Sequence, residues 1–169
     1  GGDVGSIGQT STLGGGELPA TAAPAASALT TSPTTPYNSA ELAIGEASDF
    51  ERAKAALADG DFRAAADQFA TFNQTYPGGP LGPEADLRHG DALQGLGDTR
   101  EAARAYLASF SADPTGPLAA EALFQLGKSL GELGQVQEGC VTLGEVAMRF
   151  PSSPYVAQAQ AQRAVLSCQ

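Results

Sequence analysis

The feature of the sequence that most constrains its fold is a set of glycines and prolines that recur at one interval. Gly60, Gly97 and Gly134 are 37 residues apart (97 − 60 and 134 − 97). The same interval separates two sets of prolines, which are Pro77, Pro114 and Pro151, and Pro80, Pro117 and Pro154. Self-similarity at a fixed interval of this length indicates a repeat architecture. Three copies of one unit therefore occupy about residues 46 to 155.

Each unit is predicted to form two helices. In the first unit, Ser48 and Glu51 have the spacing of a capping box, which satisfies free backbone donors where a helix begins, and Gly60 marks the helix end. The second helix is predicted to begin near Asp61 and to end before Pro77, because a proline ring nitrogen cannot continue the hydrogen-bond ladder. Two such helices cannot cover their own apolar face, so neighbouring units must stack to bury a core.

We therefore expect an all-α, right-handed helical solenoid. The predicted parts are three helix-turn-helix units at residues 46–82, 83–119 and 120–155, and a closing helix at about 154–167. Residues 1–45 are mostly Gly, Ala, Ser, Thr and Pro. They have little apolar bulk to offset the roughly 1–2 kcal/mol per residue that ordering a backbone costs, so they are predicted to form a flexible linker. A helix start at Ser39 is possible, but Gly45 is expected to interrupt it.

The charge balance excludes some classes of partner. The chain has 9 Lys and Arg against 19 Asp and Glu, which gives a formal net charge of −10. A nucleic acid backbone is neutralised by clustered Lys and Arg, and the sequence has no such cluster, so nucleic acid is not an expected partner. No apolar run approaches the roughly 20 residues that span a bilayer, so membrane insertion is not expected either.

Residues with reactive or metal-binding side chains are few. The chain has one histidine, His89, and two cysteines, which cannot supply the usual four ligands of a structural zinc site. Asp86 is one helical turn from His89, but a lone imidazole without a second ligand is more often a packed or surface residue. Cys140 has no visible histidine partner that would make it a nucleophile. The sequence therefore predicts no catalytic residue, no metal site and no cofactor.

The two cysteines are candidates for a disulfide. Cys140 is predicted to lie early in the last unit's second helix, and Cys168 at the end of the closing helix. If these helices run antiparallel about a turn near Ser152, the thiols lie within about one helical turn of each other. Closing a loop of roughly 28 residues would stabilise the fold by about 3.6 kcal/mol from chain entropy, in an oxidising compartment. The alternative is a small buried cysteine and a frayed terminal one.

The apolar, small and proline positions of the units resemble tetratricopeptide repeats. The matching positions in the second unit are Gly90, Leu93, Ala102, Tyr106, Ser109 and Pro114. Those in the third unit are Leu123, Leu126, Gly127, Leu130, Leu143 and Pro151. Two residues depart from the pattern, because His89 stands where a large apolar residue is usual and Gly139 replaces the usual alanine. These departures are expected to weaken individual helices without changing the fold.

The repeat interval and the turns between units narrow the resemblance to one family of repeat proteins. Repeats of 37 residues, with the turns Tyr76–Leu81 and Phe150–Pro154, are similar to the carboxy-terminal domain of the periplasmic Tol-Pal system proteins of the YbgF/CpoB (cell division coordinator) family. This resemblance implies a non-enzymatic periplasmic adaptor that associates with TolA and the peptidoglycan synthase machinery, coordinating wall synthesis with outer-membrane constriction. Members also trimerise through a coiled coil, but no heptad pattern precedes Ser48, so that route is not predicted here.

The resemblance also implies where a partner would bind. In tetratricopeptide solenoids the first helices line the concave surface. The matching positions are Phe50, Lys54, Leu57, Glu84, Leu87, Asp91, Gln94, Glu121, Phe124 and Lys128. Phe50, Leu87 and Phe124 could anchor a bound segment, or they could simply fill the core between units. The acidic middle helix is expected to prefer a basic or neutral partner.

A second hypothesis for the function, besides the adaptor, is an outer-membrane protein assembly factor or periplasmic chaperone of the tetratricopeptide-repeat type.

Overall fold

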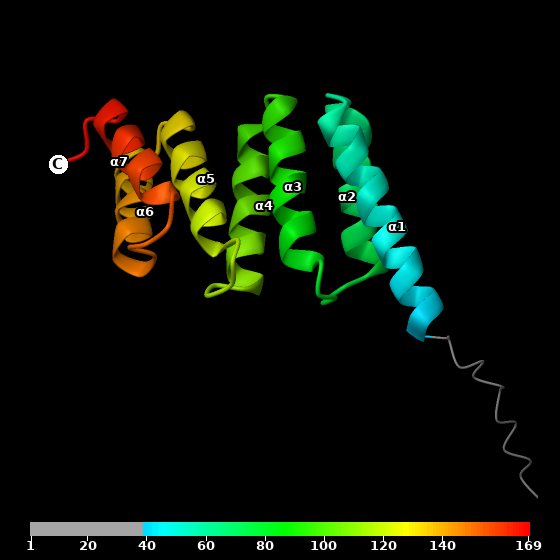
Figure 1. The fold of residues 1–169 in the computed structure, drawn as a ribbon. Helices are drawn as coiled ribbons and strands as arrows, with labels where there is room; N and C mark the ends of the chain where they lie inside the picture. Colours follow the sequence, from blue (N-terminus) through cyan, green and yellow to red (C-terminus); the bar gives the residue numbers. More distant parts are fainter. Residues whose placement is uncertain (1–38) are drawn as a thin grey trace, which may run out of the picture. The chain divides into compact units, whose positions relative to one another are not determined.

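The structure is a computed structural model that describes residues 39–169, and these residues form seven α-helices and no strand (Figure 1). The helices are α1 (Ser39–Ala58), α2 (Phe62–Thr75), α3 (Gly82–Gly95), α4 (Thr99–Ala112), α5 (Ala119–Glu132), α6 (Val136–Arg149) and α7 (Tyr155–Val165). The linker predicted for residues 1–45 lies outside the described residues as far as residue 38.

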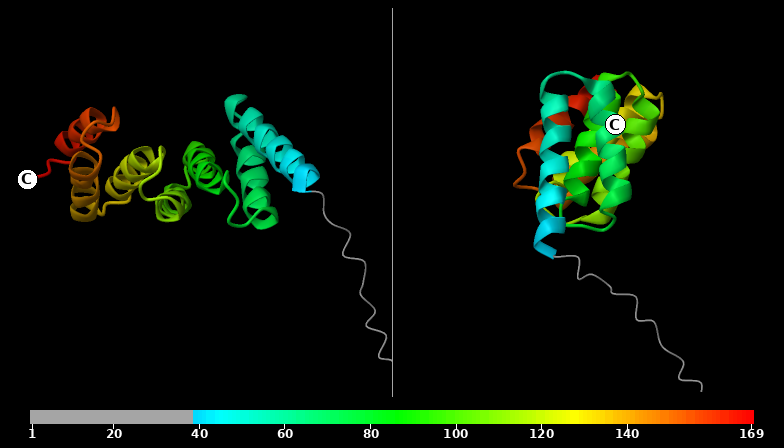
Figure 2. Two further views of the ribbon diagram at one scale, coloured as in Figure 1. Left: turned by 60° about the horizontal axis from the view of Figure 1, so that its bottom comes forward. Right: turned by 90° about the vertical axis from the view of Figure 1, so that its right-hand side faces the viewer.

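Each helix packs chiefly against the helix that precedes it and the one that follows it. Figure 2 shows that the hairpins α1–α2, α3–α4 and α5–α6 follow one another along one axis, and do not bundle around a closed centre. The closing helix α7 packs against both α6 and α5. The predicted all-α, right-handed solenoid with a closing helix is confirmed.

The predicted start of the first helix is wrong. Helix α1 begins at Ser39, not Ser48, and passes through Gly45 without a break. A single glycine lowers helix stability by only about 1 kcal/mol, and the surrounding residues are mostly good helix formers. Tyr76, just beyond α2, adds a tertiary contact, because its hydroxyl donates a 2.8 Å hydrogen bond to Asp49 Oδ2 on α1. The proposed capping box therefore lies inside a helix.

The turns within the units follow the sequence expectation closely. Each hairpin turn contains a glycine in the left-handed region, where a side chain would be strained. These are Gly60, Gly97 and Gly134, with φ of 77°, 78° and 81°. Asp61 then caps α2, since its Oδ1 accepts a 3.0 Å hydrogen bond from Ala64 N. Asp98 caps α4 in the same way through Glu101 N at 3.3 Å, whereas Gln135 makes no side-chain cap on α6.

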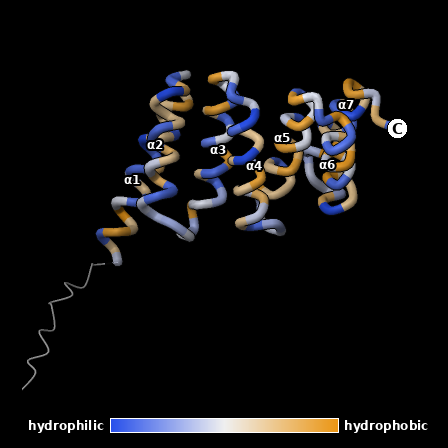
Figure 3. The backbone as a smooth tube through the Cα atoms, turned by 180° about the vertical axis from the view of Figure 1, so that it is seen from behind, coloured by the Kyte–Doolittle hydropathy of each residue, from blue (hydrophilic) through white to orange (hydrophobic). Residues whose placement is uncertain are grey.

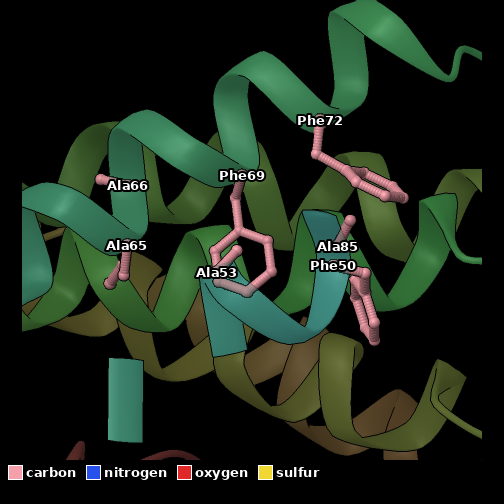
Figure 4. Close-up of a cluster of buried hydrophobic side chains, with 8 residues drawn as sticks. Phe50, Ala53, Ala65, Ala66, Phe69, Phe72 and Ala85 are labelled. Atoms are coloured by element: carbon pink, nitrogen blue, oxygen red, sulfur yellow. The ribbon is translucent and has the colours of Figure 1, made fainter. Parts of the chain in front are cut away.

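Both apolar and polar residues occur along every helix, and the apolar ones meet in three successive clusters (Figure 3). In the first cluster Phe50 of α1 packs against two rings of α2, with centroid distances of 6.2 Å to Phe69 and 5.6 Å to Phe72 (Figure 4). Alanines fill the spaces between these rings. The second cluster is centred on Leu87 and Tyr106, and the third contains Leu143. The core is thus a chain of small clusters, as stacked repeats require.

Gly139, which departs from the usual repeat pattern, lies at a close approach of α5 and α6. A Cβ atom at this position would stand 3.0 Å from the carbonyl oxygen of Gly127 and 3.1 Å from the amide nitrogen of Gly131. Both atoms belong to the backbone of α5, which cannot swing away as a side chain would. Glycine is therefore needed here for packing, and the expectation that it only weakens a helix misses this role.

The predicted disulfide is present. Cys140 of α6 is bonded to Cys168, which lies just past the end of α7, and their Cα atoms are 5.5 Å apart. The bond closes a loop with a sequence separation of 28 residues, so it ties the closing helix to the last hairpin.

Candidate functional site

The three apolar side chains predicted to anchor a partner are buried in the structure. Phe50, Leu87 and Phe124 expose 3%, 0% and 8% of their surface. Leu57 is also partly buried against the first cluster. Burial this complete favours the alternative that these side chains fill the core between units. Binding on the first helices stays a prediction, and it depends on the polar residues beside them.

The polar residues of the first helices form contacts from one unit to the next. We call Lys54, Glu84, Arg88, Asp91, Gln94, Glu121, Lys128 and Glu132 the inner ladder. Lys54 Nζ on α1 lies 3.8 Å from Glu84 Oε1 on α3. Arg88 on α3 donates from Nη1 to Glu121 Oε1 on α5 at 3.0 Å, and from Nη2 to Oε2 at 3.4 Å. These pairs join α1 to α3 and α3 to α5.

The inner ladder extends toward the hairpin turns through a neutral amide. Gln94 Nε2 on α3 donates to Glu132 Oε2 on α5 at 2.6 Å. Lys128 Nζ approaches the same glutamate, at 3.9 Å from its Oε1. The contacts thus bring six of the ten predicted groove residues, all the polar ones, onto one continuous set of neighbouring helices. Arg88 and Glu132, which were not predicted from the sequence, belong to the same set.

Arg88 is the centre of the inner ladder. Besides Glu121, its Nη1 donates to Asp91 Oδ2 at 2.8 Å, and the hydroxyl of Tyr106 donates to Asp91 Oδ1 at 3.0 Å. Burial alone would lower the pKa of Arg88, but the hydrogen bonds to Glu121 and Asp91 raise it above its ordinary value, so the guanidinium stays charged. Burial raises the pKa of Asp91, and the hydrogen bonds from Arg88 and Tyr106 counter this only in part.

Arg88 changes the expected electrostatics of the middle unit. The sequence predicts an acidic middle helix, but Glu84 faces Lys54 and Asp91 is paired with Arg88 within the chain. Two of its carboxylates are therefore already compensated. A signal for this existed, because Arg88 is three residues before Asp91, where oppositely charged side chains meet on one helix face. The pairing of Arg88 with Glu121 spans 33 positions and has no such local signal.

Lys54 and Lys128 are the more accessible cations of the inner ladder. Their side chains are 39% and 40% exposed, and their contacts with carboxylates, at 3.6 to 3.9 Å, are long. Lys54 Nζ also lies 5.1 Å from the centroid of the Phe50 ring. Asp91 occupies the equivalent position in the middle unit, 37 residues from each lysine. The ladder therefore presents two reachable cations that flank a compensated centre.

Tyr155 at the start of α7 continues this face. Its ring centroid lies 5.6 Å from that of Phe124, and burial followed by the charge of Glu121 raises the pKa of its hydroxyl. No local sequence pattern marks this tyrosine, since the packing of α7 against α5 brings it next to the inner ladder.

His89 and Asp86 are not brought together. Asp86 accepts a 2.7 Å hydrogen bond from Asn73 Nδ2, and burial raises the pKa of its carboxyl to about 6 although that hydrogen bond lowers it. His89 instead lines a cleft with Asp67 of α2, and burial lowers the pKa of its imidazole. Within residues 39–169 no three His, Cys, Asp or Glu side chains are placed to hold a metal ion.

Comparison with known families identifies the repeats. The sequence pattern of the family described as "Tetratricopeptide repeat" matches residues 87–154, which cover most of α3 and all of α4, α5 and α6. Residues 87–154 therefore match tetratricopeptide repeats, in agreement with the stacked helical hairpins. No curated protein matches the sequence. None of the helices between residues 39 and 169 is long and apolar enough to cross a bilayer. Tetratricopeptide repeats typically act as protein-binding scaffolds, and the inner ladder lies on α1, α3 and α5, the first helices of the three units.

Proposed function

We propose that this protein is a non-enzymatic adaptor whose tetratricopeptide-repeat domain binds a segment of another protein along the inner ladder. The observation that carries the proposal is the row of partly exposed charged and amide side chains across α1, α3 and α5. Lys54 and Lys128 hold their intramolecular carboxylates at long distance, so an incoming carboxylate can compete for them. The buried rings beside them keep this face rigid.

The partner segment has a defined charge pattern in this proposal. It presents carboxylates to Lys54 and Lys128, and a neutral or basic stretch to the compensated middle unit around Arg88. A mixed pattern of this kind sets the register of a bound segment more than its affinity, because exposed charge pairs contribute only about 0–1 kcal/mol each.

We place this adaptor in the periplasm, within the Tol-Pal system, where it would link TolA and the peptidoglycan synthase machinery during division. Two observations support this placement. The Cys140–Cys168 disulfide is a bond that persists in oxidising compartments and is rare in the cytosol. The interval of 37 residues and the turn sequences resemble those of the YbgF/CpoB family.

The test is direct binding of purified proteins by calorimetry, using the full chain, the periplasmic part of TolA and the periplasmic domain of a wall synthase. The ladder variant is K54E with K128E, and the matched control is R52E with R63E, which changes the net charge equally on α1 and α2. We expect the ladder variant to lose more than tenfold in affinity and the control to change less than threefold. Equal losses in both variants would refute the ladder as the site.

The same experiment separates the proposed system from the chaperone hypothesis. If neither TolA nor the synthase binds, but an unfolded outer-membrane polypeptide binds and is released by K54E with K128E, the ladder is a site and the Tol-Pal placement is wrong. Circular dichroism of each variant checks that the helices are intact.

A further inference from the structure

Two clefts of nearly equal size repeat along the side of the stack and contain no residue of the inner ladder. The first side cleft lies between α2 and α3 and has a volume of about 440 Å³. The second side cleft lies between α4 and α5, is about 430 Å³, and is lined by Arg100, Arg104, Leu107, Leu126, Leu130 and Leu133, among others. Both volumes fall in the range of about 300–1,000 Å³ that is usual for ligand sites.

The two side clefts are built from equivalent positions of successive units but differ in chemistry. Arg104 of the second cleft replaces Asp67 of the first, at the interval of 37 residues. In the same way Leu126 replaces His89. Both clefts share one arginine (Arg63 or Arg100) and two leucines (Leu93 and Leu96, or Leu130 and Leu133). The first adds the polar Asp67 and His89, whereas the second has a second arginine and the further leucines Leu107 and Leu126.

The corresponding place in the third unit is filled by the chain itself. Cys140 occupies the position equivalent to Ala103 of the second cleft, and it is bonded to Cys168. Arg163 of α7 occupies the position equivalent to Leu126, and its guanidinium carbon would lie 3.7 Å from a Cβ at Gly144. Of the two side clefts, the second has the more leucines and has two arginines without an aspartate, whereas in the first Arg63 is accompanied by Asp67.

Packing of the core does not require a leucine at position 107. The side chain of Leu107 is 50% exposed, and the equivalent positions of the first and third units hold Ala70 and Gly144. The repeat folds with a small residue at this position, so the exposed leucine is surplus to packing. An apolar side chain from a partner would cover Leu107 together with Leu130 of the same cleft.

The two arginines of the second side cleft favour an anion. Arg104 is 70% exposed and donates one 2.8 Å hydrogen bond to Glu101, which leaves other N–H groups of its guanidinium for a ligand. Arg100, on the first turn of α4, has no ion pair among residues 39–169. Cations at a helix amino terminus oppose the helix dipole, whereas a bound anion is favoured by both the dipole and the arginine. The nearby Asp98 is committed to capping α4.

We propose that the second side cleft binds an acidic amphipathic segment of another protein, with its leucine-type side chains on the leucines of the cleft and its carboxylates on Arg100 and Arg104. The site uses none of the inner-ladder residues, so it stands or falls separately from the proposed function. An adaptor with both sites holds two protein segments at once.

The test uses a fluorescein-labelled peptide, acetyl-Ser-Glu-Leu-Leu-Glu-Leu-Gly-amide, as the probe, with fluorescence anisotropy on the full chain. Two control probes replace both glutamates by glutamine, or all three leucines by serine. We expect R100E and R104E each to weaken binding of the acidic probe about tenfold or more, and L107A, which recreates the first cleft's small residue, to weaken it about threefold. R63E, the matched change in the first side cleft, should leave it unchanged.

Location is checked by amide chemical shifts of the full chain during titration with the acidic probe. Shifts confined to α4, the second half of α5 and the turn after it support the proposal. Shifts on the inner ladder, equal binding of the glutamine probe, or equal losses from R63E overturn it. A second labelled peptide copies residues 13–20, where Glu17 precedes Leu18. Tighter binding of that peptide at the same amides would make the chain's own segment the occupant and would refute a foreign partner.

Discussion

Two glycines in the middle of α6 provide a sharp test of the packing described above, because the same substitution should have opposite effects at them. Alanine is more favourable than glycine in a helix interior by about 1 kcal/mol. At Gly144 the new Cβ would meet only the guanidinium of Arg163, at 3.7 Å, which is ordinary contact with a flexible side chain. We therefore expect G144A to raise the free energy of unfolding by about 0.5–1 kcal/mol.

At Gly139 the same gain in helix propensity is outweighed by the backbone of α5. The new Cβ would stand 3.0 Å from Gly127 O and 3.1 Å from Gly131 N, so α5 and α6 must separate. Overpacking of this kind costs about 1–3 kcal/mol, so after the gain of about 1 kcal/mol in helix propensity G139A should be less stable than the parent by up to about 2 kcal/mol.

The assay is equilibrium unfolding in urea followed by far-ultraviolet circular dichroism on both variants and the parent chain. Hydrogen exchange in α6 shows whether the change is local, which matters because stacked repeats can unfold unit by unit. If G139A is as stable as the parent, or if the two substitutions shift the midpoint in the same direction, the close approach of α5 and α6 is not what the structure indicates.

Three further predictions concern stability. Replacing both cysteines, C140S with C168S, should lower the free energy of unfolding by up to about 3.6 kcal/mol, the loop entropy for a separation of 28 residues. The loss should first appear as faster amide hydrogen exchange in α7. Unchanged exchange in α7 would contradict a stabilising role for the disulfide. The buried carboxyl of Asp86 has its pKa raised to about 6, so the folded state holds this proton more tightly and stability should fall as pH rises from about 4 through about 6. D86N can still accept the hydrogen bond from Asn73, so it should remove this fall in stability with rising pH. After allowance for partial exposure, it should raise the free energy of unfolding by about 1 kcal/mol at pH 7.5 and leave it unchanged at pH 4. Urea unfolding midpoints measured across this pH range test the prediction. Finally, Q135D should supply the missing cap of α6 and add about 0.5–1 kcal/mol by the same measurement, and no gain would mean that this turn is already satisfied.

The hairpin turns could be predicted from the sequence because their causes are local. A glycine that must adopt positive φ, followed directly by an aspartate that caps the next helix, is readable within a few residues, as at Gly60 and Asp61. The start of α1 could not be predicted in this way. The Tyr76 contact that supports it comes from a residue 27 positions from Asp49.

The candidate site was predictable in outline and not in detail. The 37-residue interval correctly identifies which helices are equivalent, so Lys54 and Lys128 occupy equivalent positions on α1 and α5, on either side of α3. It cannot say whether a recurring apolar residue faces outward or inward, and Phe124 proved to be buried. The pairing of Arg88 with Glu121 depends on how one unit is rotated against the next, which no local pattern encodes.

The disulfide makes the two ends of the stack mechanically unequal. The last hairpin and α7 are tied covalently, whereas α1 is held by packing and carries the exposed side chains of Leu42 and Ile44 in its first turns. A pulling force applied through the amino-terminal end would therefore peel α1 and then α2 away while the disulfide-tied end stayed folded. A partner bound to α5 would therefore remain attached while the helices at the amino-terminal end unfold under tension.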